Sequence, residues 1–454
     1  MTKFSWLLLA VLVLPACTMI PKYQRPAAPV APQYAGTAST ATNTAADLAW
    51  RDFISDERLQ EWVALSLHNN RDLRVASLNV AQSRAQYRIT QAAAYPGIDA
   101  NGSFAREHAA GATTDTWNAN IGTTSYEVDL WGRVRSLSRE ALEKYFATDA
   151  ARMAAKISLV AEVSRQYFAL RSAEEQIGLA EQTRQAVQEN YTVNQARFEA
   201  GASDELDLRT AEGQVQTAKI NVLTYQRQRD EAMNALVLLA GQPWPANLPV
   251  ARPFMATNLL AAVAPGLPSE LVQRRPDILE AEYTLRAANA NIGAARAAFF
   301  PRITFTSSIG TTSDEFSKLF TSGTGVWGFS PQITLPIFTG GQNRADLDSA
   351  KISTRIEIAN YEKAIQTAFR EVADALTDTQ AYGRELTERA ALVKAQQQRL
   401  SLATARYEHG ADTYLNVLSA QQDLYSAQQG QIQAQYNRLA SQISLYQALG
   451  GGWK

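Results

Sequence analysis

Residues 275–278 read Arg-Pro-Asp-Ile, and residues 70–73, which lie 205 positions earlier, read Asn-Arg-Asp-Leu. Two more pairs of matching segments follow in the same order: Tyr-Pro-Gly-Ile at 95–98 with Phe-Pro-Arg-Ile at 300–303, and Arg-Phe-Glu-Ala-Gly at 197–201 with Arg-Tyr-Glu-His-Gly at 406–410. The offset grows only from 205 to 209 positions, which fits a few residues inserted in loops. A duplication of this length predicts two copies of one large structural unit.

The composition of the chain excludes several classes of protein. It has 454 residues, a formal net charge of −1, three histidines and one cysteine. A charge so close to zero gives no basic surface for nucleic acid, so we expect no nucleic-acid partner. The histidines are scattered and show no metal-ligand spacing. We therefore expect no metal, no bound cofactor and no catalytic residue, and the protein is predicted not to be an enzyme.

The N-terminus has the pattern of a bacterial lipoprotein signal. Lys3 is followed by an apolar run at 6–14 that is too short to span a bilayer. The next residues, Leu-Pro-Ala-Cys at 14–17, resemble a lipobox, so we expect residues 1–16 to be a signal peptide and Cys17 to carry a covalent lipid such as palmitate. Thr18, in place of an aspartate, favours the outer membrane. The alternative is a plain secretory signal with an incidental cysteine.

Residues 17–50 follow the signal and are rich in proline, alanine and threonine. This composition predicts an extended, lipidated tether. After it, we expect a first repeat at 51–241, a proline-rich connector at 242–268 and a second repeat at 269–454.

Each repeat contains helical stretches of unusual length. The predicted helices are 56–94, 133–200 and 204–240 in the first repeat, and 269–299, 342–409 and 413–449 in the second. A stretch of about 68 residues would form a helix of about 100 Å. Gly201 and Gly410 stand where the longest helices end, and glycine can take the left-handed conformation there. Each repeat is therefore expected to form a long helical hairpin with a glycine at its tip.

The apolar residues of the last helix recur with alternating spacings of three and four. Leu415, Leu418, Tyr425 and Ile432 belong to one such seam, and Val417, Ala420, Leu424 and Ala427 belong to a second. A sustained 3–4 spacing is typical of knobs-into-holes packing between supercoiled helices. Two seams on one helix indicate a neighbouring helix on each side, as in a barrel of helices.

Between the helices, four segments alternate apolar and polar residues: 98–104, 117–122, 303–309 and 327–335. Alternation with period two predicts strands with one apolar and one polar face. Four strands cannot close a transmembrane barrel, whose smallest examples have about eight, and open sheet edges are not tolerated in lipid. Three chains would supply twelve strands. The predicted fold is therefore an α+β membrane channel, a trimeric 12-stranded transmembrane β-barrel with four strands per chain, continued by a long periplasmic barrel of helices.

At this point the residues resemble a known family, the outer-membrane efflux lipoproteins of the TolC and OprM type. The resemblance is carried by the lipobox and by four segments: 275–282, 291–301, 127–133 and 334–338. It implies a homotrimeric channel in the outer membrane that extends into the periplasm. It further implies a periplasmic adaptor protein and a proton-driven inner-membrane pump of the RND class as partners, with drugs and toxic small molecules as cargo.

The resemblance also implies a gate at the periplasmic tips of the helical hairpins, which close like an iris. The positions concerned are Leu415, Asn416, Ser419 and Gln422 in the second repeat and Asp204, Asp207 and Arg209 in the first. Relatives often carry aspartate where this chain has Asn416 or Ser419, and some carry arginine at Gln422. Our hypothesis is that Leu415 forms an apolar constriction, while Asp207 with Arg209 provides a polar lock. The alternative is that Leu415 is ordinary coiled-coil core and the charges are solvated.

Two other functions remain open on the sequence alone. A protein-secretion exit duct of type I would have the same architecture. A lipid-anchored coiled-coil scaffold without a pore would use the helices but not the strands, and the alternating segments argue against it.

Overall fold

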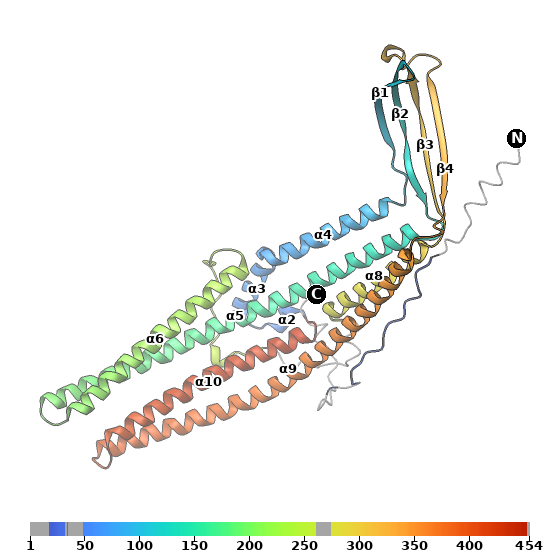
Figure 1. Cartoon of the computed structure of the whole chain (residues 1–454). Coiled ribbons are helices and arrows are strands. Elements are labelled where there is room, and N and C mark those ends of the chain that lie inside the picture. Colours follow the sequence, from blue (N-terminus) through green and yellow to red (C-terminus); the bar gives the residue numbers. More distant parts are fainter. Residues whose placement is uncertain (1–17, 32–33, 35–48, 260–273, 452–454) are drawn as a thin grey trace. The chain divides into compact units, whose positions relative to one another are not determined.

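The computed structural model describes residues 18–31, 34, 49–259 and 274–451, so the signal peptide and Cys17 lie outside the described residues. The chain divides into two compact units (Figure 1). The strand unit consists of 1–27, 78–150 and 279–364, and the hairpin unit consists of 28–77, 151–278 and 365–454. The two longest helices, α5 (Arg133–Glu199) and α9 (Gln342–Glu408), begin in the strand unit and end in the hairpin unit.

The strand unit contains a four-stranded antiparallel sheet in the order β1-β2-β3-β4. Its strands are β1 (Asp99–Ala109), β2 (Ala112–Val128), β3 (Arg302–Ser313) and β4 (Gly325–Thr334). The four predicted strands are thus confirmed, each somewhat longer or shifted at its ends. Among the described residues, β1 and β4 have a hydrogen-bonded neighbour on one side only, so both edges of the sheet are open there.

One face of this sheet is apolar and the other is polar. Directly paired residues share a face, and the row Ile121, Ile309 and Trp327 crosses three strands. Ile309 is 69% exposed and Trp327 is 81% exposed, so none of the residues that the structure describes covers this apolar face. The opposite face carries small polar side chains: Asn118, Asn120, Thr304, Thr306, Ser308, Ser330 and Gln332.

Aromatic pairs mark both ends of the apolar face. Phe104 packs on Trp117 with ring centroids 4.3 Å apart, and Tyr126 packs edge-on against Phe305 at 5.1 Å. Trp117 and Tyr126 are nine residues apart on β2, which is about 30 Å along a strand. If the strand is tilted by about 40°, this length spans about 23 Å of membrane depth. That depth is close to the ~25 Å apolar band of outer-membrane barrels.

The hairpin unit pairs the end of α5 with α6 (Glu205–Ala240) and the end of α9 with α10 (Tyr414–Ala448) (Figure 1). Gly201 and Gly410 have φ values of +72° and +70°, in the left-handed region. The next residue in each turn donates its amide back to the helix, from Ala202 to the Arg197 carbonyl at 2.8 Å and from Ala411 to the Arg406 carbonyl at 2.9 Å. The two hairpin turns therefore have the same backbone design.

The two predicted seams of α10 are largely buried within the single chain, but Leu415, which starts the first seam, is exposed. Leu418, Ile432 and Leu439 of the first seam and Val417, Ala420 and Ala427 of the second are all almost inaccessible to solvent. On α6 the buried residues Ala211, Val215, Ala218, Val222, Ala232 and Leu236 fall on one seam with the same alternation of three and four. The 3–4 spacing thus identified the packed faces of both helices correctly.

Shorter elements complete the two units. They are α2 (Trp50–Phe53), α3 (Glu57–Asn69), α4 (Arg71–Ala92), the 3-10 turn η3 (Phe254–Ala256), α8 (Pro276–Ala297) and the 3-10 turn η4 (Phe316–Lys318). The hairpin unit has an aromatic core in which Phe53 stacks on Tyr446 at 4.0 Å and Trp62 meets Trp244 edge-on at 4.8 Å.

The prediction of one continuous helix at 56–94 was wrong. The helix is interrupted at Asn70, whose φ of −59° and ψ of 131° are not helical. The Asn70 side chain accepts a hydrogen bond from the Leu73 amide at 2.9 Å and donates one to the Leu239 carbonyl at 2.9 Å. Because this residue starts a new helix and also holds the end of α6, the apolar periodicity alone did not reveal the break.

Candidate functional site

The tip of the first hairpin is rich in charge. Asp204 caps α6 by accepting a hydrogen bond from the Asp207 amide at 2.9 Å. Arg209 pairs with Glu212 at 2.8 Å and with Glu205 at 3.4 Å, and these two carboxylates raise its pKa. Asp207 instead receives a hydrogen bond from the Ser203 hydroxyl at 3.2 Å. Within one chain, Asp207 and Arg209 are thus engaged with different partners.

The tip of the second hairpin exposes a large apolar side chain. Leu415 is 69% exposed, so it is not part of the core that the hairpin forms by itself. Its neighbour Asn416 donates a hydrogen bond to the Asp412 carboxylate, which also accepts the Thr413 amide. These donors, Asn416 first, lower the pKa of Asp412. Asp412 therefore places a negative charge in this turn, and sequence reasoning had not singled out this residue for the gate.

The other two predicted gate residues lie one and two turns further along α10. The Ser419 hydroxyl accepts a 3.3 Å hydrogen bond from Arg399 of α9, and Arg399 also pairs with Asp423. Gln422 lines a small cavity of about 90 Å³ together with Val187 and Tyr425. Ser419 therefore belongs to a cross-link within the second hairpin, whereas Gln422 faces the first hairpin.

The two hairpins also meet near their tips. Arg197 of α5 lies 5.5 Å from the ring centre of Tyr407 on α9 and donates a hydrogen bond to its hydroxyl. Tyr407 in turn packs against Tyr414, with ring centroids 5.2 Å apart. Sequence reasoning missed this contact, although Arg197 and Tyr407 both belong to the repeated segments that revealed the duplication.

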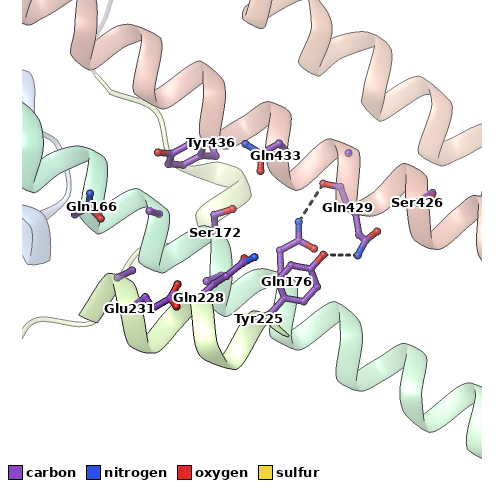
Figure 2. A pocket seen from close by; sticks show the side chains of 14 residues that line it. Gln166, Ser172, Gln176, Tyr225, Gln228, Glu231, Ser426, Gln429, Gln433 and Tyr436 are labelled. Carbon is purple, nitrogen blue, oxygen red and sulfur yellow. Dashed lines mark hydrogen bonds between the residues drawn. The ribbon is translucent and has the colours of Figure 1, made fainter. Parts of the chain in front are cut away.

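Further from the tips, α5, α6 and α10 enclose a groove of about 770 Å³ (Figure 2). Figure 2 shows two hydrogen bonds across it: Gln176 donates to the Gln429 carbonyl at 3.3 Å, and the Gln429 amide donates to the Tyr225 hydroxyl at 2.7 Å. Glu231 is the one charged residue of its lining. Neutral amide groups, which exchange partners at little cost, therefore join α10 to the first hairpin here.

A charged junction links the strands to α5. Glu127 at the end of β2 pairs with Arg133 at 2.6 Å and with Arg302 at 2.8 Å. Asp129 accepts the amides of Val134 and Arg135 at 3.1 and 2.9 Å and thereby caps the helix. These are the residues of the 127–133 segment that carried the family resemblance, and their role here is to turn the chain from sheet to helix.

The segment after Cys17 is bound to the strand unit. We call residues 19–25 the N-terminal strap. The Glu282 carboxylate, with a side chain only 3% exposed, accepts hydrogen bonds from Arg25 at 2.7 Å and Tyr23 at 3.2 Å, and Arg286 at 2.6 Å completes the cluster. Asn289 and Arg296, further along α8, donate to the backbone carbonyls of Pro21 and Met19. This part of the expected tether is extended but docked along one helix.

The described residues contain neither a helix that could cross a membrane nor a metal-binding cluster. In that part of the chain, no helix combines the length and the hydropathy needed to cross a bilayer. The same residues contain no cluster of three or more histidine, cysteine or acidic side chains of the kind that holds a metal.

Comparison with known proteins fits this geometry. The family described as "Outer membrane efflux protein" matches residues 62–242 and again 267–451, once in each repeat. The toluene efflux pump outer membrane protein TtgC of Pseudomonas putida is 44% identical over 469 residues, covering 100% of this chain and 96% of that protein. Outer membrane protein OprJ of Pseudomonas aeruginosa is 43% identical, covering 98% and 95%.

Solved structures show the same fold. The open state of the MtrE outer membrane channel of Neisseria gonorrhoeae superimposes with a TM-score of 0.91 at 40% identity, covering 96% of this chain and 99% of that one. A membrane protein from Pseudomonas aeruginosa gives a TM-score of 0.90 at 42% identity. The sheet and the paired long hairpins are therefore those of outer-membrane channels, and the chain belongs to the outer membrane efflux protein family.

Proposed function

We propose that three copies of this chain form a passive exit duct for drugs and toxic small molecules in the outer membrane. The observation that carries the proposal is the sheet, which has an uncovered apolar face, a polar opposite face and two open edges. Open edges are not tolerated in lipid, and four strands are too few to close a barrel. Three chains give twelve strands, with β1 of one copy pairing with β4 of the next and the polar face lining the bore.

The duct works with a periplasmic adaptor and an inner-membrane RND pump. Relatives named as outer membrane proteins of toluene and antibiotic efflux pumps support this assignment. Cargo passes along a bore lined mostly by polar side chains, and no covalent chemistry is involved. The proposed lipid on Cys17 adds a membrane anchor, and the docked strap holds the chain close to that anchor at Met19.

The gate lies at the hairpin tips. Leu415 of the three copies forms the apolar constriction, supported by its exposure in the single chain. Asp204, Asp207 and Arg209 of the first hairpin and Asn416, Ser419 and Gln422 of the second flank it. Opening is a shift of population between two packings of the helices, biased by contacts with the adaptor.

The proposal is tested on the purified protein in detergent and in planar lipid bilayers. Native mass spectrometry is expected to show three chains per particle, and the particles are expected to insert and give discrete conductance steps. A monomeric protein, or a trimer that never conducts, would contradict the duct and favour a scaffold without a pore.

A further inference from the structure

A cavity of about 680 Å³ lies where α3 ends and α4 begins, beside residues 152–156 of α5. Five basic side chains line it: His68, Arg71, Arg74, Arg152 and Lys156. No carboxylate is among the lining residues. In a chain of net charge −1, such a concentration of one sign is unusual and requires a physical reason.

The neutral polar groups of this cavity are already engaged with the chain itself. Asn69 donates to the Gln242 side chain at 3.0 Å, Asn70 binds the Leu239 carbonyl at 2.9 Å, and Ser77 donates to the Leu73 carbonyl at 2.9 Å. The remaining capacity for hydrogen bonds is therefore cationic.

The guanidinium groups of Arg71 and Arg74 lie one turn apart on α4 and are both exposed to solvent. Neither forms an ion pair or a side-chain hydrogen bond with any residue in the described ranges. Two carboxylates are near in sequence but do not line the cavity. They are Asp72, between the two arginines, and Asp149, one turn before Arg152 on α5. The two arginines thus offer planar donor groups to an external ligand.

Arg152 and Lys156 form the other wall and are half-buried on α5. They are four residues apart, so their like charges face each other on one side of the helix, an arrangement that disfavours the helix. Burial and the charge of Arg152 lower the pKa of Lys156. Both charges attract an anion that enters the cavity.

We propose that this cavity binds an oxyanion carrying two or more negative charges, such as a phosphate group or clustered carboxylates. Guanidinium groups bind both by paired N–H···O bonds, and the ammonium group of Lys156 adds a point charge. The exposed pair Arg71 and Arg74 carries two positive charges, which an oxyanion with two negative charges matches. This inference does not depend on the proposed transport function.

The test is calorimetric titration of the full-length trimer at low ionic strength with pyrophosphate and, separately, with tricarballylate, which carries three carboxylates. The double variant Arg71→Gln/Arg74→Gln removes the exposed pair. Arg84→Gln, which changes an exposed arginine of the same helix outside the cavity, is the matched control. Lys156→Gln tests the opposite wall.

The expected result is saturable binding of at least one of the two probes, with one site per chain. Affinity falls roughly tenfold or more in the double variant and in Lys156→Gln and stays unchanged in Arg84→Gln. Binding of pyrophosphate alone assigns a phosphate ligand, and binding of both probes assigns a general polyanion. Nanodiscs then show where the natural ligand comes from. If phosphatidylglycerol displaces the bound probe and phosphatidylcholine does not, the ligand is a lipid headgroup. If neither lipid displaces the probe, the ligand is a soluble anion.

Three results would overturn the proposal: no binding of either probe, undiminished binding in the double variant, or an equal loss in Arg84→Gln. Because the variants are compared as trimers with the same elution volume and melting temperature, failure to fold is detected separately. In the wild type the bound probe should also raise the melting temperature, since a ligand of the folded state stabilises it.

Discussion

Arg275 donates a 2.8 Å hydrogen bond from Nη1 to the carbonyl oxygen of Ala448, and so ties the start of α8 to the last residue of α10. In the first repeat Asn70 donates in the same way to the Leu239 carbonyl near the end of α6. Asn70 and Arg275 occupy equivalent positions in the duplicated segments. In each repeat, the residue just before α4 or α8 therefore binds the end of the second hairpin helix. The binding group is the amide of Asn70 in the first repeat and the guanidinium of Arg275 in the second.

Replacing Arg275 by alanine is expected to destabilise the hairpin unit by about 2–3 kcal/mol, because its charge-assisted hydrogen bonds to three partner residues are lost. Besides Ala448, Arg275 binds the carboxylates of Asp277 and, at 2.8 Å, Glu371. Burial by itself would lower the pKa of Arg275, but the two carboxylates outweigh burial and raise this pKa. Chemical denaturation of the purified protein measures the change. Arg370→Ala, which breaks an exposed pair with Asp374, should cost less than about 1 kcal/mol, and an equal effect of the two substitutions would refute the role of Arg275.

The two faces of the sheet should respond oppositely to a new charge. Ile309→Arg places a cation on the face assigned to lipid and is expected to cost about 2–4 kcal/mol, reducing insertion into the outer membrane. Ser308→Arg, on the neighbouring residue and the opposite face, should insert normally and change the ion conductance of the pore. Outer-membrane fractionation and bilayer recordings measure these effects. Normal insertion of Ile309→Arg together with failure of Ser308→Arg would reverse our assignment of the faces.

The strap should loosen in alkali. Burial, and next the negative charge of Glu282, raise the pKa of Tyr23 to about 12 from an ordinary value of 10.0. Between these values the folded protein holds a proton that the unfolded chain has lost, so the contribution of Tyr23 to stability is complete below about pH 10 and falls as the pH rises to about 12.

The absorbance of ionised tyrosine is measured against pH in the wild type and in Tyr23→Phe. The difference between the two curves reports Tyr23 and should have its midpoint near pH 12. In a Glu282→Gln background the midpoint should move down. A midpoint at the ordinary value in the wild type would show that the strap is not docked in solution.

Leu415→Ala should increase the single-channel conductance of the trimer, because it removes the apolar side chain that we place at the constriction. Leu402→Ala, which truncates an exposed leucine of α9 away from the turn, serves as the control and should leave conductance unchanged. Unchanged conductance in Leu415→Ala would eliminate the constriction and leave the tip charges as the candidates for the gate.

The sequence predicted those parts of the structure that repeat or alternate. The four strands, the ends of α5 and α9 at their glycines, and the two seams of α10 all follow from local periodicity and turn chemistry. The break at Asn70 did not, because a side chain that caps one helix and holds another acts through residues far away in sequence.

The candidate site was predictable only in outline. The tips could be located from Gly201 and Gly410, but the partners of the charges could not be assigned, since i,i+3 and i,i+4 neighbours compete with contacts across the hairpins. Arg209 binds Glu205 and Glu212, and Arg399 reaches both Ser419 and Asp423. The docked strap was hidden for a similar reason, because its composition resembles that of a free linker while its binding depends on side chains of α8 far away in sequence, the buried Glu282 among them.

The most direct test of the account is the drug susceptibility of cells that lack this gene, with and without the gene for the adaptor. We predict lower inhibitory concentrations for several unrelated toxic compounds after deletion, no further decrease when the adaptor is also removed, and restoration by the intact gene but not by the Ile309→Arg variant. Unchanged susceptibility, or the loss of a secreted polypeptide in its place, would contradict the role in small-molecule efflux.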